Sequence, residues 1–182
     1  YLSSDQLRAI NSAAINALTS TELAILASKD SFKGLSTLQI TALSSEQLNS
    51  LNSQELSTFD SNDISAISTV ALAKLETTQI ALLNSAQVQG LTTVQLKALS
   101  TDLIESLSST TIPGLRTSQV AALSSTQWTE AKTSQIQALK TAQIAAIQTD
   151  DIAGLTSDHV GALLSAQVAA ITTDQLRALD TT

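Results

Sequence analysis

One short segment of this 182-residue chain carries the residue types of a catalytic triad, Ser157, Asp158 and His159. A triad works only when its members converge on one reacting atom, and it is recognised by that geometry. Adjacent residues on one short helical turn point in different directions and do not converge in this way. His159 also occupies a position where most related segments have Gln. We therefore predict that His159 replaces Gln as a local hydrogen-bonding group.

Two acidic pairs, Asp60 with Asp63 and Asp150 with Asp151, are candidates for holding a cation. Neither pair lies in a D-x-[DN]-x-[DN]-G loop or in a Gly–Asp-rich nonapeptide. The chain has one His and no Cys, which excludes sites built from several His or Cys ligands. No Gly-rich phosphate loop or paired nucleophile and base occurs either. The sequence predicts no catalytic, cofactor-binding or metal-binding residues, and a protein that is not an enzyme.

The charge balance and the hydropathy exclude two further classes. The chain has 9 Lys and Arg against 16 Asp and Glu, a net charge of -7 and a pI of about 4.4. Nucleic-acid binders need a basic face to neutralise phosphates, so we expect no nucleic-acid partner. No stretch of 18 residues is continuously apolar, so we expect no membrane span.

The elements that position these residues come from an internal repeat of eight residues. From Ser36 to Leu179 the chain divides into eighteen octads without remainder, and residues 3–26 supply three more. Residues 27–35 form one octad with an extra residue. The chain is therefore predicted to be a single tandem array of twenty-two units over residues 3–179. Both ends lack a polar capping unit, which indicates an excerpt from a longer array.

Each position of the octad has its own preference. Position two is Ser or Thr in every unit, and position four is Gln in twelve units. Position five is always apolar, position eight is Leu or Ile except at Phe59 and Ala131, and position seven is mostly Ala or Gly. Positions one, three and six vary and are mainly polar.

This pattern predicts an all-α fold. In a continuous helix, eight residues advance the apolar stripe by about 80° per octad, so no single face is buried. In a strand, positions five and eight lie on opposite faces, whereas one helical turn brings them to the same face. We predict one very short helix per octad, stabilised only by stacking into a solenoid or superhelix.

The start of each helix has two possible registers, one residue apart. The constant Ser or Thr at position two suits an N-cap. Alternatively, position one is the N-cap, and Gln or Glu at position four completes a capping box. The row of hydroxyls at position two also has two functional interpretations: acceptors for O-linked glycans, or binding of a regular surface such as carbohydrate or ice.

Two irregular units test the predicted fold. Residues 124–131 combine a large residue at position five, Trp128, with the small Ala131 at position eight, as conservation of core volume predicts. Pro113 stands at position six, where it lacks the N–H that a continuing helix needs. We expect Pro113 and its neighbours, Ile112 and Gly114, to distort their unit.

Arg116, Lys132 and Lys140 all occupy position one. They are candidates for a basic ridge that contacts an acidic polysaccharide, although a solvated face is the simpler interpretation.

The nine-residue unit holds Phe32 between Lys29 and Lys33. Insertions often mark binding loops in repeat proteins, so this unit is a second candidate for a binding surface.

Units such as TSQIQAL, TAQIAAI and TTDQLRAL resemble the "LTTxQIxAL" octapeptide arrays of very large, adhesin-like secreted or surface proteins of bacteria. The resemblance covers the whole chain. It implies a bacterial source, export and an extracellular location at the cell surface, and it supplies no catalytic residues to carry over.

We therefore expect a structural repeat region, a superhelical spacer or stalk or an element of an extracellular layer. One alternative is a binding module that recognises a glycan or a partner protein along the solenoid surface. Another is a length-measuring component of a secretion or appendage system. The expected partners are cell-surface glycans or other domains of the same chain.

Overall fold

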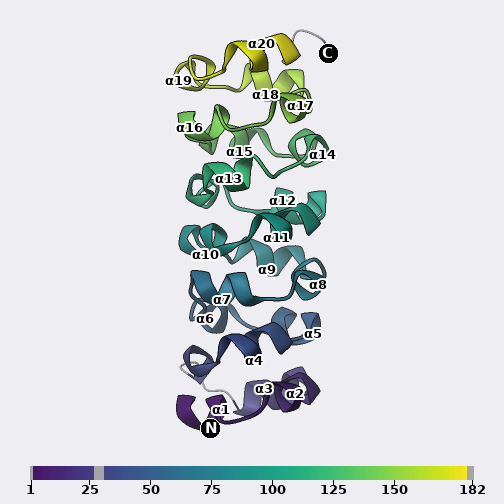
Figure 1. The fold of residues 1–182 in the computed structure, drawn as a ribbon, viewed down its shortest axis with the longest axis vertical. Helices are drawn as coiled ribbons and strands as arrows, with labels where there is room; N and C mark the ends of the chain where they lie inside the picture. Colours follow the sequence, from purple (N-terminus) through teal and green to yellow (C-terminus); the bar gives the residue numbers. More distant parts are fainter. Residues whose placement is uncertain (1, 27–30, 180–182) are drawn as a thin grey trace. The chain divides into compact units, whose positions relative to one another are not determined.

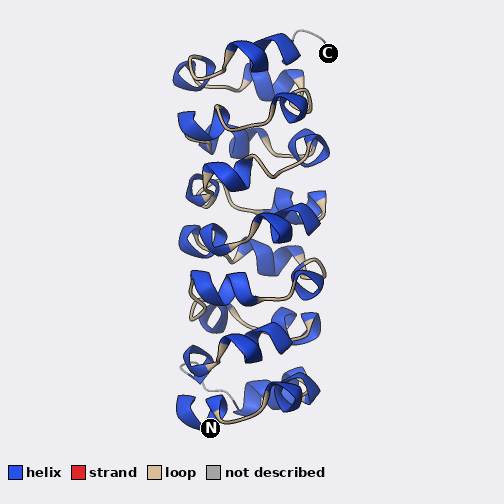
Figure 2. Ribbon diagram, in the orientation of Figure 1, coloured by secondary structure: helices blue, strands red, loops and turns tan. Residues whose placement is uncertain are grey.

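A computed structural model describes residues 2–26 and 31–179, and it consists of short helices joined by short loops (Figure 1, Figure 2). Internal contacts divide the chain into two compact halves, residues 1–91 and 92–182. The helices of the N-terminal half are α1 (Ser4–Arg8), α2 (Ser12–Ala17), α3 (Ser20–Leu26), η1 (Ser31–Gly34), α4 (Thr37–Ala42), α5 (Ser45–Asn49), α6 (Ser53–Leu56), α7 (Ser61–Ala66), α8 (Thr69–Leu72), α9 (Thr77–Ala81) and α10 (Ser85–Gly90).

The C-terminal half repeats the same plan. In the described parts of both halves, each octad contains one helical element, either an α-helix or, in η1 and η2, a 3-10 helix. The predicted all-α solenoid with one short helix per octad is therefore confirmed. The helices of this half are α11 (Thr93–Ala98), α12 (Thr101–Ser106), η2 (Ile112–Gly114), α13 (Thr117–Val120), α14 (Ser125–Thr129), α15 (Thr133–Ala138), α16 (Thr141–Ile144), α17 (Thr149–Ile152), α18 (Ser157–Gly161), α19 (Ser165–Val168) and α20 (Thr173–Leu179).

Position one, not position two, is the N-cap. In α4, the Ser36 hydroxyl accepts a hydrogen bond from the Gln39 N–H, and Gln39 Oε1 accepts one from the Ser36 N–H, which makes a capping box. The position-two residue, Thr37, is already the first helical residue. The position-two register is therefore wrong, because an N-cap hydroxyl reaches N–H groups two or three residues ahead and position four supplies the matching side chain.

Except in α3 and α20, the helices end before position eight, and they do so without a left-handed residue. In the first regular octad after the nine-residue unit, the Leu43 N–H donates to the Ile40 carbonyl, and Leu43 itself takes an extended conformation with ψ 133°. No described residue has a positive φ. The position-five carbonyl accepts the N–H of position eight, whereas the position-eight carbonyl has no partner within its own helix because the exit is extended.

Within each half, a helix packs on the helix three octads further along the chain. In the N-terminal half α4 packs on α7 and α7 on α10, and in the C-terminal half α14 packs on α17 and α17 on α20. Hydrogen bonds also join octads four units apart, such as Gln39 to Leu7. One turn of the solenoid thus contains between three and four octads. Figure 1 shows successive turns side by side within each half.

At Gly90 and Gly154, position seven approaches the backbone of position two in the preceding turn, whereas a larger residue at position seven, Lys74, is exposed. An added Cβ at Gly90 would lie 2.4 Å from the Ser61 carbonyl oxygen, and one at Gly154 would lie 2.3 Å from that of Ser125. Both contacts join octads three units apart. At both places position two therefore lies directly opposite position seven, and the contact is made by its main chain.

Gly154→Ala is expected to destabilise the protein by about 1–3 kcal/mol, because the new methyl group forces two packed turns apart. Gly161→Ala is the matched control: a Cβ there meets no atom within 4 Å. Alanine at this helical position should stabilise by about 0.4–1 kcal/mol. Urea unfolding of both variants checks the opposite signs, and equal effects would contradict the contact.

The core is formed by positions five and eight. Leu7, Ile40, Ile80 and Ile136 are all 0% exposed at position five, and the pattern continues to Ile152. No helix among the described residues combines the length and apolar character that a membrane span requires.

The two irregular octads behave as predicted. Trp128 and Ala131 are both buried and line the same small apolar cavity, so the large and the small residue share one space. Pro113 lies in η2, where a 3-10 turn replaces the α-helix. Ile112 and Leu115 of that octad remain in the core, so the distortion is local.

Candidate functional site

Gln side chains at position four form the most regular polar feature of the fold. Except at Gln79, the Oε1 atom accepts the N–H of position one in its own octad, at 2.9 Å for Lys132 to Gln135 and 2.7 Å for Lys140 to Gln143. Gln79 Oε1 is buried with no partner among the described residues, because the Glu76 N–H donates to Asn49 Oδ1 instead. Neither lysine caps its helix with its own side chain. Because Gln supplies this bond, position one tolerates Lys, Arg and even Leu164.

The Nε2 atom of the same Gln donates to the preceding turn. Gln135 Nε2 lies 2.9 Å from the Ile104 carbonyl oxygen and 2.7 Å from that of Leu107, which are positions five and eight of the octad four units earlier. The Ile104 carbonyl also accepts the Leu107 N–H of its own octad, so Gln135 uses its second lone pair, whereas the Leu107 carbonyl has no partner within its own helix. We call this set the glutamine ladder. Its members with bonds within one half are Gln39, Gln47, Gln79, Gln87, Gln127, Gln135, Gln143, Gln167 and Gln175.

His159 makes the predicted local hydrogen bond in place of Gln, and it also contacts the preceding turn. Its Nδ1 accepts the Thr156 N–H at 3.2 Å, and its Nε2 lies 2.7 Å from the Ala131 carbonyl oxygen, which assigns the proton to Nε2. The ring is 4% exposed, whereas Ser157 and Asp158 are exposed. Both ring nitrogens are engaged with the main chain, so the structure does not bring these three residues together as a triad.

The acidic pairs also bind main-chain N–H groups. Asp60 Oδ1 accepts from the Asp63 N–H at 2.9 Å, and Asp63 Oδ2 accepts from the Asp60 N–H at 2.9 Å. Asp151 Oδ1 accepts from the Ser125 N–H of the preceding turn at 2.7 Å. No group of three potential metal-ligating side chains occurs in the described part of the chain.

The basic series does not form the single ridge that the sequence suggested. Arg116 and Lys140 begin helices α13 and α16, which pack on each other. Lys132 begins α15, which packs on α18 and η2 instead, and its Nζ lies 3.6 Å from Glu105 Oε1. The separation follows from the turn length, because octads align at intervals of three and not of one or two.

The described residues of the nine-residue unit, 31–35, contribute to the core. Phe32 is 1% exposed and packs on Phe59, with ring centroids 6.3 Å apart. Lys33 is exposed, and Lys29 lies outside the described residues.

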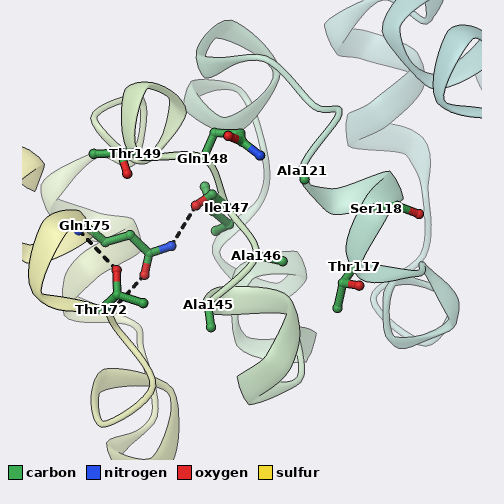
Figure 3. Close-up of a pocket in the computed structure, with 10 residues that line it drawn as sticks. All are labelled: Thr117, Ser118, Ala121, Ala145, Ala146, Ile147, Gln148, Thr149, Thr172 and Gln175. Carbon is green, nitrogen blue, oxygen red and sulfur yellow. Dashed lines mark hydrogen bonds between the residues drawn. The ribbon is translucent and has the colours of Figure 1, made fainter.

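Two grooves occur at equivalent places in the two halves. Each follows the loop from position six of one octad to position two of the next, between neighbouring turns. The C-terminal groove is about 480 Å³, and Figure 3 shows Gln175 at its edge, bonded to Thr172 and to the Ile147 carbonyl. Its lining is uncharged and combines hydroxyl and amide side chains with three alanines and one isoleucine: Thr117, Ser118, Ala121, Ala145, Ala146, Ile147, Gln148, Thr149, Thr172 and Gln175. The N-terminal groove includes Thr41, Ala42, Leu43, Ser44, Ser45, Ser68 and also charged Glu46 and Lys74.

The family model of the ALTTAQ repeat matches residues 56–93, 72–109, 132–165 and 144–181, together more than half of the chain. The chain belongs to the ALTTAQ repeat family. A comparison with curated proteins found no match. The relationship of this chain to known proteins is therefore its membership of the ALTTAQ repeat family.

In this ALTTAQ repeat array the inter-turn role of Gln was missed from the sequence, although a signal was present. A capping box accepts Glu as readily as Gln. Twelve Gln at position four therefore indicate a need for the amide donor that Glu lacks.

Burial raises the pKa of the Asp63 carboxyl group, and the neighbouring Asp60 charge adds to the rise, while the bond from the Asp60 N–H opposes it. Helices α4 and α10, which pack on α7, carry no titratable side chains. Because the folded pKa exceeds the unfolded value of about 3.9, the associated stability is full below that value. It is lost as the pH rises through the folded pKa.

Asp63→Asn keeps an acceptor for the Asp60 N–H and removes the titration. The variant is expected to be more stable than the parent at pH 7 and to lose this advantage as the pH falls towards about 4. Chemical denaturation of both proteins at the two pH values checks this. An unchanged difference between them would contradict the assignment.

Proposed function

We propose that this ALTTAQ repeat array is a structural spacer, a superhelical stalk in a large secreted or surface protein of a bacterium. The observation that supports it is the recurrence of one set of inter-turn bonds. Gln Nε2 reaches carbonyls 31 and 28 residues earlier in octad after octad, as at Gln127, Gln143 and Gln175.

A repeated bond set of this kind favours a mechanical role over a catalytic one. Each octad adds the same buried aliphatic pair and the same rung, so stability accumulates by contacts with neighbouring turns. The side chains of types that can act in catalysis or metal binding, His159 and Asp151, hydrogen-bond the main chain. An array of this type becomes longer by adding octads that repeat the same contacts between turns.

The spacer proposal is tested by adding octads. Residues 132–163 are duplicated in the full chain, and the parent and the extended protein are compared by small-angle X-ray scattering. The expected result is a greater maximum dimension with an unchanged cross-section. An unchanged maximum dimension, with growth in all directions, would overturn the spacer.

The location is tested separately. In the source organism, an antibody against the array is expected to label intact cells or the culture medium. Labelling only after the cells are permeabilised would overturn the surface assignment and leave the spacer itself standing.

A second candidate function is recognition of a neutral oligosaccharide, and the equivalent grooves of the two halves favour it. Hydroxyl and amide groups line the C-terminal groove without charge. The test is calorimetry of the full chain with soluble glucans and chitin oligomers. Ala145→Trp fills this groove and should reduce binding from two sites to one, whereas Trp at the exposed Ala166 should change nothing. Absence of binding would remove this candidate.

A further inference from the structure

The glutamine ladder is interrupted in the N-terminal half over three successive octads. Their position-four residues are Glu55, Asp63 and Ala71. An ionised carboxylate has acceptors only, and an alanine side chain has neither donors nor acceptors. None of the three donates to the main-chain carbonyls four octads earlier. Intact rungs lie on either side, at Gln39 and Gln47 before the interruption and at Gln79 and Gln87 after it.

The interruption covers nearly one full contact between turns, because a turn contains between three and four octads. We name this contact the open seam: octads 52–75 on one side and the described residues of octads 19–43 on the other. The open seam is held by Phe32 against Phe59, by the packing of α4 on α7, and by the Thr41 hydroxyl, which donates to the Ala66 carbonyl at 2.9 Å.

The two acids perform only half of the Gln role. Glu55 Oε2 accepts the Asn52 N–H and Asp63 Oδ2 accepts the Asp60 N–H, both at 2.9 Å, so each caps its own helix. Both side chains are half-buried, whereas the Gln rungs around them are at most 7% exposed. The acids therefore preserve the local helix and omit the bond to the preceding turn.

We infer that the open seam is a built-in opening point, at which the N-terminal half separates before its other turns do. The helices on both sides stay capped, so opening divides the solenoid between turns. This inference does not depend on the spacer proposal, since it concerns the order in which turns open in any setting.

The experiment is hydrogen exchange of the full chain at pH 7, read at equivalent position-five amides. Leu56, Ile64 and Leu72 lie on the open seam, and Ile80 and Val88 follow intact rungs. Each of the five donates within its own octad to the carbonyl four residues earlier. The seam amides are expected to exchange at least tenfold faster than the other two, because opening exposes them first.

The decisive variant is Glu55→Gln, which is isosteric, keeps the acceptor for Asn52 and adds the missing donor. It should slow exchange at Leu56 several-fold. The triple variant with Asp63→Gln and Ala71→Gln should bring all three seam amides to the rate at Val88. Glu76→Gln makes the same change in charge at an exposed position one and should leave the seam rates unchanged.

Two results would overturn the inference: equal exchange at the five amides in the parent chain, or seam rates in Glu55→Gln that match those of Glu76→Gln. Because Glu55→Gln alters no steric contact, a folding failure of the triple variant would leave this comparison intact.

Discussion

Gln135→Glu is expected to lower the free energy of unfolding at pH 7 by about 3–5 kcal/mol, the cost of leaving a buried charge uncompensated. Gln135 is 3% exposed, and its Nε2 donates to the carbonyls of Ile104, Glu105 and Leu107. The substitution keeps the cap on Lys132 and places a carboxylate oxygen opposite three carbonyl oxygens. Urea denaturation at pH 7 measures the loss.

Two comparisons separate the ladder from a general effect of charge. Gln148→Glu makes the same change at an exposed position one of the same half and should stay within about 0.5 kcal/mol of the parent. At low pH, Gln135→Glu should recover part of its stability, because the protonated acid has an O–H donor. If both variants had the same effect at pH 7, the ladder would contribute nothing measurable to stability.

Trp128→Ala is the second change with a large expected effect, a loss of about 3–5 kcal/mol. Trp128 is 4% exposed and faces Leu96, Ile104 and Leu139 across a gap of only about 10 Å³. Ala131 already supplies the smallest side chain found at position eight, so the variant leaves one octad without a large core residue. Thermal and urea unfolding measure the loss.

The control is an alanine substitution at an exposed position five of the same half. Leu176 also occupies position five but is 60% exposed, so Leu176→Ala should cost less than about 0.5 kcal/mol. Trp128→Leu with Ala131→Leu restores the ordinary octad and removes a buried Nε1–H without a partner in the described structure. This pair should be more stable than Trp128→Leu alone. Equal stability would show that Trp128 and Ala131 are independent.

The fold could be predicted from the sequence because it depends on residue spacing within each octad. The spacing of positions five and eight defines one helical face per octad, and a break every eight residues excludes longer helices. The replacement of Gln by His159 and the compensation of Trp128 by Ala131 follow from the same comparison of octads. Pro113 distorts its unit because its ring removes the backbone N–H that a continuing helix needs.

The turn length and the donor role of Gln could not be predicted from the sequence, because both depend on contacts with residues about thirty positions away. The capping box and the inter-turn bond use the same residue. In the stacked structure Gln39 Oε1 accepts the Ser36 N–H, and Gln39 Nε2 donates to the Leu7 carbonyl. The predicted ridge of Arg116, Lys132 and Lys140 failed for the same reason. Equal positions in neighbouring octads face different directions when a turn contains between three and four of them.

This turn length means that the number of octads encodes an angle as well as a distance. Because three to four octads complete one turn, inserting or deleting one octad rotates everything after it by between a quarter and a third of a revolution. Gene duplications in steps of twenty-four nucleotides would therefore reorient an attached domain while changing its reach only slightly. Two arrays that differ by a single octad would therefore present the same domain in directions a quarter to a third of a revolution apart, so the number of repeats determines the orientation of an attached domain.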